Sequence, residues 1–133
     1  MNKALKYQVG GNHYQSMGMQ PIELINLIDL NYNLGNVVKY IVRYPNKNGL
    51  EDLKKARHYI EFEKQYRTHK KSDPKKVSHI WEDFFNSNTS LNDFQLETLA
   101  YIKIYAVTGS ESEKGLDNAL ECISKFLSNQ SSF

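Results

Sequence analysis

The segment from Leu50 to Arg67 places the strongest constraint on the fold. Its apolar side chains Leu53, Ala56 and Ile60 recur every three to four residues, and charged residues occupy most of the other positions. Acidic residues stand in the first turn and basic residues in the last, an order that suits the helix dipole. This spacing predicts an amphipathic α-helix with one buried face.

Five further segments show a helical pattern. Pro21 suits a first helical turn, and Pro45 must end another helix because proline has no backbone N–H to donate. With only three prolines and seven glycines, the chain is also poor in the turns of a β-sandwich. We therefore expect an all-α fold, a small helical domain of about three helices with a C-terminal helical extension. Ser90 is the expected cap of the fifth helix, and Ser110 or Ser112 that of the last. The expected helices besides 50–67 cover residues 21 to about 31–33, 37–44, 77–85, 91–107 and a last helix that starts after its serine cap and ends near residue 127.

Charge divides the chain into a basic and an acidic part. Residues 1–76 hold 14 basic and 7 acidic residues, a net charge of +7, whereas residues 77–133 hold 3 and 8, a net charge of −5. One explanation of this asymmetry is that oppositely charged surfaces pack together, either within one chain or between the subunits of a homo-oligomer. The other explanation is an anion-binding site in the basic part. The polar stretch 68–76 predicts an exposed linker. We expect a domain at 1–68 with the candidate site, a basic linker at 69–76 and an acidic helical extension at 77–133 that acts as structural cover or oligomer interface.

Several classes of protein are excluded by what the sequence lacks. No apolar run approaches the roughly 18–20 residues of a membrane span, and the first residues do not resemble a secretory signal. A single cysteine, Cys122, rules out an internal disulfide and a cysteine-rich zinc site. No glycine-rich phosphate loop is present, nor are the paired acidic motifs that hold magnesium in all-α nucleotide pyrophosphohydrolases. We expect a cytoplasmic protein that contacts no membrane.

The second expected helix carries the first candidate site, an anion site. Asn36, Lys39, Tyr40 and Arg43 recur at spacings of three, four and seven residues and therefore share one helix face. Lys39 and Arg43 project one turn apart. The compact ammonium group of a lysine beside the planar guanidinium of an arginine suits the binding of phosphate oxygens. The alternatives are a solvated helix face or a salt bridge to Glu51 or Asp52.

Two further elements of the basic part fit a phosphate ligand. In the opening loop, adjacent glycines, among them Gly11, let backbone N–H groups approach a ligand. His13 can transfer a proton near neutral pH, and Tyr14 can stack or donate a hydrogen bond. On the helix at 50–67, Lys55 stands among other basic residues. The alternatives are a packed turn for the loop and a solvated face for the helix.

Four motifs of the basic part together resemble a known family. The motifs are Gly10-Gly-Asn-His-Tyr14, Gln20-Pro-Ile-Glu23, Gly35-Asn-Val-Val-Lys-Tyr-Ile-Val-Arg-Tyr44 and Lys47-Asn-Gly-Leu-Glu-Asp-Leu-Lys-Lys-Ala-Arg-His-Tyr-Ile60. Over about residues 7–64 the chain is similar to the phage proteins grouped as domain of unknown function 3310 (SaV-like), a family that includes a phage kinase of deoxynucleoside monophosphates. Residues 70–133 resemble no known family.

The resemblance implies a phage protein that binds a nucleotide in the host cell cytoplasm. His13 is then the catalytic candidate. No cofactor is certain; in a kinase Mg²⁺ is possible, with Glu51 and Asp52 as the motif candidates for holding it, at most through water. The nucleotide- and phosphate-binding candidates are Gly11, Tyr14, Asn36, Lys39, Tyr40, Arg43, Lys47 and Lys55.

Three functions remain open at this point. The first is nucleotide binding with phosphoryl transfer, as in a deoxynucleoside monophosphate kinase without a P-loop. The second is a non-catalytic sponge that sequesters a nucleotide immune signal of the host. The third is a protein inhibitor of a host factor that uses the aromatic residues of the acidic part, although we expect those to be core. The favoured partner is a nucleotide-derived small molecule, and a long nucleic acid is disfavoured by a sequence pI of only 8.5.

Overall fold

The structure, a computed structural model, describes residues 3–6, 8–9, 11, 17–109 and 112–131. Within these residues the fold is all-α and has no strand, as the sequence predicts, and it holds six α-helices, three before residue 68 and three after residue 73. Two short 3₁₀-helices, η1 and η2, accompany them. The elements are η1 (Lys3–Lys6), α1 (Pro21–Leu27), α2 (Tyr32–Arg43), η2 (Tyr44–Asn46), α3 (Leu50–Tyr66), α4 (Pro74–Ser87), α5 (Asp93–Thr108) and α6 (Lys114–Ser131).

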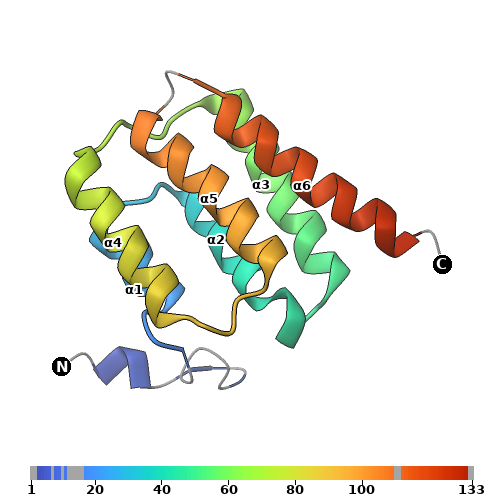
Figure 1. The fold of residues 1–133 in the computed structure, drawn as a ribbon, viewed down its shortest axis with the longest axis horizontal. Helices are drawn as coiled ribbons and strands as arrows, with labels where there is room; N and C mark the ends of the chain where they lie inside the picture. Colours follow the sequence, from blue (N-terminus) through green and yellow to red (C-terminus); the bar gives the residue numbers. More distant parts are fainter. Residues whose placement is uncertain (1–2, 7, 10, 12–16, 110–111, 132–133) are drawn as a thin grey trace.

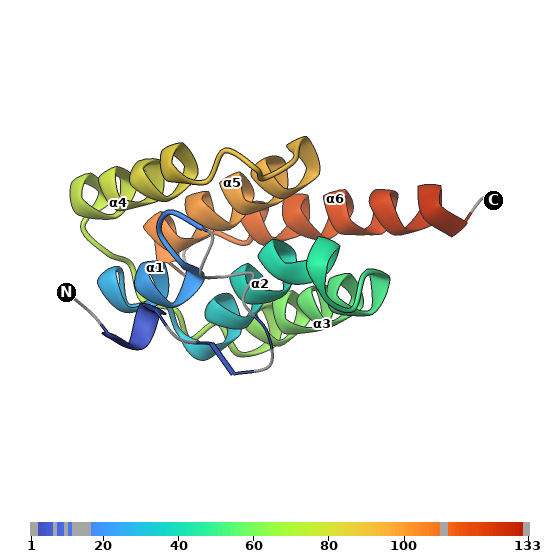
Figure 2. The same cartoon turned by 90° about the horizontal axis from the view of Figure 1, so that it is seen from below.

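The helices form two layers. Helices α1, α2 and α3 lie in one layer, and α4, α5 and α6 cover them as the second layer (Figure 2). Across the layers α1 packs on α4, α2 on α5 and α3 on α6, and the same pairs lie together in Figure 1. The basic part of the chain therefore supplies one layer and the acidic part the other. None of the described helices is long and apolar enough to cross a membrane.

One hydrophobic core fills the space between the layers. Trp81 and Phe84 of α4 are fully buried in it, which confirms that these aromatic residues of the acidic part are core. Phe85 and Phe94 are partly buried and pack against the same core. The residues at 77–133 are thus half of a shared core. Its largest fully buried side chains also include Leu24, Leu34, Ile41, Leu53, Ile60, Leu99, Ile102, Tyr105, Leu116 and Ile123.

The expected boundary between the first two helices is wrong. Helix α1 ends at Leu27 instead of near residues 31–33, and α2 begins at Tyr32 instead of Val37. The reason is Asn31, whose side-chain oxygen accepts a hydrogen bond from Leu34 N–H and so caps α2. Gly35 therefore lies inside α2, where a Cβ would sit 3.4 Å from Ile25.

Two later helix boundaries also differ from the expectation. Helix α5 begins at Asp93 because Asn92, not Ser90, is its cap: the Asn92 side chain accepts from Gln95 N–H, and the Gln95 side chain accepts from Asn92 N–H. Helix α6 runs from Lys114 to Ser131, beyond the expected end at residue 127. Ser112 accepts a hydrogen bond from Lys114 N–H, and Ser110, the alternative cap, lies outside the described residues.

The stretch at 68–76 is only partly the exposed linker that its composition predicts. Arg67 ends α3 in the left-handed conformation, with φ of 51°. His69 is then buried, with 3% of its surface exposed. Pro74 already starts α4, with the Asp73 side chain accepting from Lys75 N–H. A polar stretch can hold a buried histidine where neighbouring helices supply partners, which composition alone does not reveal.

Candidate functional site

Three cationic side chains surround the ring of Tyr40. Lys39 Nζ lies 4.5 Å from the ring centroid, Arg43 Cζ 4.8 Å and Lys55 Nζ 5.6 Å. Each distance is within the about 6 Å over which a cation is attracted to an aromatic face. Lys39 and Arg43 come from α2, and Lys55 comes from α3, which packs along it. With Tyr59, described below, we call these residues the Tyr40 cluster.

Arg43 is also held by a buried carboxylate. Its Nε and one terminal nitrogen donate to the two oxygens of Asp52, both at 3.1 Å, and Asp52 is fully buried. Asp52 accepts a further hydrogen bond from Asn48 N–H at 3.3 Å. The structure therefore contains the salt bridge that the sequence offers as an alternative role for Arg43. This bidentate pair fixes the guanidinium and ties the end of α2 to the start of α3.

The two lysines of the cluster differ from Arg43 in their charge environment. Lys39 and Lys55 are both partly exposed. Within the part of the chain that the structure describes, neither of them forms an ion pair. The positive charge at the cluster is consequently concentrated on these two ammonium groups, and solvent reaches both.

Aromatic rings continue from the cluster along the same two helices. The ring of Tyr59 stacks on Tyr40, with centroids 6.0 Å apart and planes at 18°. On its other side Tyr59 meets Tyr32, at 5.8 Å and 72°. A hydrogen bond with Tyr32, burial and the neighbouring phenols raise the pKa of Tyr59 to about 12, so its hydroxyl stays neutral at physiological pH.

Three other predicted ligand residues, Asn36, Lys47 and Gly11, are among the described residues. Asn36 is on α2 between Tyr32 and Tyr40, and its amide donates to the Tyr32 carbonyl. Lys47 is exposed in the turn after η2, and Gly11 is exposed near the N-terminus. His13 and Tyr14 lie outside the described residues, so their roles stay predictions. The structure thus brings together Lys39, Tyr40, Arg43 and Lys55 of the predicted set.

A second polar centre, which the sequence reading missed, surrounds Glu63 of α3. This side chain is fully buried and accepts four hydrogen bonds. Asn31 and Asn33 donate to Oε1 at 2.8 and 3.2 Å, and the His69 N–H and the Tyr105 hydroxyl donate to Oε2 at 3.0 and 2.7 Å. Glu63 follows Ala56 and Ile60 at helical spacing and so lies on the apolar face of α3. A charged residue on that face was the feature of the sequence from which this centre could have been predicted.

The pKa values in this centre follow from burial and these donors. Burial acts to raise the pKa of Glu63, but the hydrogen bonds from Tyr105, Asn31, His69 and Asn33 outweigh it and lower the pKa below its ordinary value. Burial lowers the pKa of His69, against the opposing fields of Glu63 and Asp29. Both oxygens of Glu63 are occupied by donors, and the centre therefore serves to join helices rather than to move protons.

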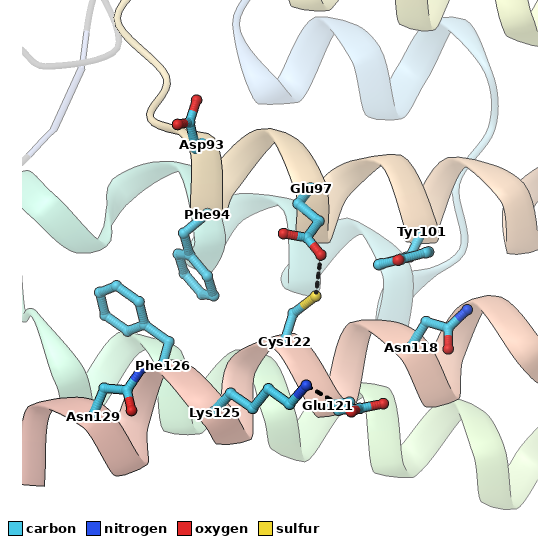
Figure 3. Close-up of a pocket in the computed structure, with 10 residues that line it drawn as sticks. All are labelled: Asp93, Phe94, Glu97, Tyr101, Asn118, Glu121, Cys122, Lys125, Phe126 and Asn129. Atoms are coloured by element: carbon cyan, nitrogen blue, oxygen red, sulfur yellow. Dashed lines mark hydrogen bonds and ion pairs between the residues drawn. The ribbon is translucent and has the colours of Figure 1, made fainter.

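The second layer contains a cavity of about 380 Å³ between α5 and α6. Figure 3 shows the Cys122 thiol donating to Glu97 across it, at 3.4 Å, and the stacked rings of Phe94 and Phe126, whose centroids are 4.2 Å apart. Burial and the Glu97 carboxylate raise the pKa of Cys122 to about 11, so the thiol stays protonated and is a poor nucleophile. No residue of the Tyr40 cluster lines this cavity.

The carboxylates of the family-like motifs do not form a magnesium site. Asp52 directs both oxygens at Arg43 and at Asn48 N–H, which leaves it engaged. Glu51 is exposed beside it on α3. Among the described residues there is also no group of three or more metal-ligating side chains. As the structure places them, Glu51 and Asp52 do not fit the Mg²⁺ that a kinase would use.

Fold and cluster define a two-layer helical protein with a basic, aromatic surface on its first layer. Residues 8–61 match the model of a family described as "Protein of unknown function (DUF3310)". The matched segment contains every member of the Tyr40 cluster. No curated protein and no solved structure gives a significant match to the chain.

Proposed function

We propose that this chain binds a nucleotide, with the phosphate held by the cations of the Tyr40 cluster. The observation that supports this most is the convergence of three cationic side chains on one ring from two helices. Phosphate oxygens accept strong, charge-assisted hydrogen bonds from lysine and arginine.

The two kinds of cation have different tasks in this proposal. Arg43 is oriented by Asp52 before any ligand arrives, so little conformational entropy is lost when it meets a phosphate. Lys39 and Lys55 supply the charge that attracts the anion, because the charge of Arg43 is largely offset by Asp52.

Binding without turnover is the form of this function that the site supports best. A phosphoryl transferase must neutralise charge on the transferring group, commonly with magnesium held by carboxylates. Asp52 is instead engaged by Arg43. We therefore favour a sponge that holds a nucleotide signal over a phage kinase. The kinase is supported by the family resemblance and by His13 as a candidate catalytic residue.

The test is nucleotide binding by paired lysine variants, measured by isothermal titration calorimetry with dAMP. Lys55→Ala should weaken binding about tenfold, near the lower end for a charge-assisted hydrogen bond because the lysine is partly exposed. Lys54→Ala removes the same charge from the preceding position of α3, which is exposed, and should change the affinity for dAMP little. Equal effects of the two variants, or no binding by the unaltered protein, would refute the site.

Product analysis separates the functions. Incubation with dAMP and ATP followed by chromatography should return the nucleotides unchanged, and formation of a diphosphate would establish the kinase instead. Arg43→Ala is the less suitable variant, because it leaves Asp52 buried without its partner and should cost about 3 kcal/mol of stability. Loss of binding in that variant would not distinguish a ligand contact from unfolding.

A further inference from the structure

We propose that the ligand of the Tyr40 cluster is a short single-stranded oligonucleotide, with a phosphate at the cations around Tyr40 and a base on Tyr32. This inference rests on the proposed nucleotide binding and adds the class of ligand. It follows from the row of rings that runs from Tyr40 through Tyr59 to Tyr32 and from the position of the cations at one end of that row.

The row is too long for one base. Tyr32 and Tyr40 are eight residues apart on α2, a rise of about 12 Å at 1.5 Å per residue. Both rings contact Tyr59, at 5.8 and 6.0 Å, which places them on either side of it. A mononucleotide bound with its phosphate at the lysines therefore leaves Tyr32 uncovered.

Tyr32 offers a free surface for a base. Its side chain is 74% exposed although it carries a large ring at the first position of a helix. Tyr59 meets it at 72°, so the contact is edge-to-face and Tyr59 does not cover Tyr32 as a stacked ring would. Base stacking on such exposed aromatic rings is the usual way in which proteins hold single strands.

The charge and the shape of this surface also fit a short chain. The three cations lie at the Tyr40 end, and Asn36 lies between Tyr32 and Tyr40 along α2. Because Tyr32 and Tyr40 are about 12 Å apart along the helix, a ligand needs more than one nucleotide to place a phosphate at the cations and a base on Tyr32. Tyr32 is exposed and Tyr40 and Tyr59 are partly exposed, so solvent and a chain lying along α2 can reach this row.

Two ligands with the same base and the same terminal phosphate test this inference. The affinities of dAMP and of a 5′-phosphorylated deoxyadenosine tetranucleotide are measured by titration calorimetry on the full chain. We expect the tetranucleotide to bind at least tenfold more tightly. Tyr32→Ala should remove about tenfold from the tetranucleotide affinity, within the range for stacking of one base, and should leave dAMP binding within twofold.

Two further variants control for the ring and for folding. Tyr32→Phe keeps the ring and should keep the tetranucleotide affinity. Tyr66→Ala removes another exposed tyrosine of this layer, 61% exposed and outside the row, and should have no effect. Equal affinities of the two ligands, or an equal loss for both in Tyr32→Ala, would overturn the inference while nucleotide binding stands. Absence of binding for both ligands would overturn the inference and the proposed function together.

Discussion

Replacing Glu63 with glutamine should destabilise the protein strongly although the two side chains have nearly the same shape. In the structure each carboxylate oxygen accepts two hydrogen bonds, from Asn31 and Asn33 at Oε1 and from His69 and Tyr105 at Oε2. A glutamine amide puts an NH₂ group in place of one oxygen. That NH₂ group can only donate hydrogen bonds, and the groups that face it are themselves hydrogen-bond donors.

The size of the effect follows from which donors can adapt. If the NH₂ group takes the Oε2 position, the Tyr105 hydroxyl can turn and accept from it, but the backbone N–H of His69 cannot turn and loses its partner. At the Oε1 position both asparagine amides lose theirs. One buried donor left unpaired costs about 1–3 kcal/mol, and the remaining hydrogen bonds lose their charge assistance. We expect Glu63→Gln to lower the free energy of unfolding by about 2–4 kcal/mol, a large fraction of a typical total.

The chain provides its own probe for this measurement. Trp81 is the only tryptophan and is fully buried in the core, so its fluorescence should report unfolding in urea. Linear extrapolation gives the free energy of unfolding for each variant. Glu61→Gln is the matched control, because it makes the same change at an exposed position of α3 and should shift stability by less than about 0.5 kcal/mol.

Similar stabilities of the two variants would refute this account of Glu63. Such a result would mean that water or side-chain movement satisfies the donors around Glu63 as well as its carboxylate does. A loss above about 1.5 kcal/mol in Glu63→Gln alone supports the account.

Three further outcomes follow from other parts of the fold. Stability should fall as the pH drops below about 6.5, because His69 binds a proton in the unfolded state but not in the folded state, where its pKa is lowered. It should fall further below about 4.5, because the pKa of Glu63 is also lowered by folding and the unfolded state binds its proton first. Urea midpoints measured across this pH range would show both losses. Gly115→Ala should cost about 1–3 kcal/mol in thermal melting, because its Cβ would lie 2.6 Å from the Tyr101 carbonyl oxygen. The charge halves predict a homo-oligomer, and light scattering that gives a mass of 15.5 kDa at micromolar concentration would contradict it.

The sequence was sufficient for the fold class and for the strongest helix, but not for several boundaries. Helix 50–67 was predicted within one residue because its apolar spacing and terminal charges agree. The starts of α2 and α5 were misplaced because Asn31 and Asn92 act as caps, while nearby glycine and serine gave competing signals. Which of several polar residues caps a helix depends on backbone geometry that spacing does not specify.

The candidate site was predictable within one helix and not between helices. The spacing of Lys39, Tyr40 and Arg43 correctly placed them together, because neighbours on one helix face follow from helical geometry alone. The contribution of Lys55 depends on how α3 packs along α2. The donors of Glu63 come from three other segments, and only the tertiary structure brings them together.

The two buried carboxylates of α3 explain why the cluster can be both basic and ordered. Asp52 ties α3 to the end of α2 through Arg43, and Glu63 ties it to the start of α2 through Asn31. The two helices are therefore fixed relative to each other at both ends by buried, hydrogen-bonded charges, which are costly to disrupt. Because these anchors lie inside the fold, no carboxylate is needed on the outer face to align the helices. Lys39 can therefore remain without an acidic partner in the described chain, on a surface whose geometry is set before a ligand binds.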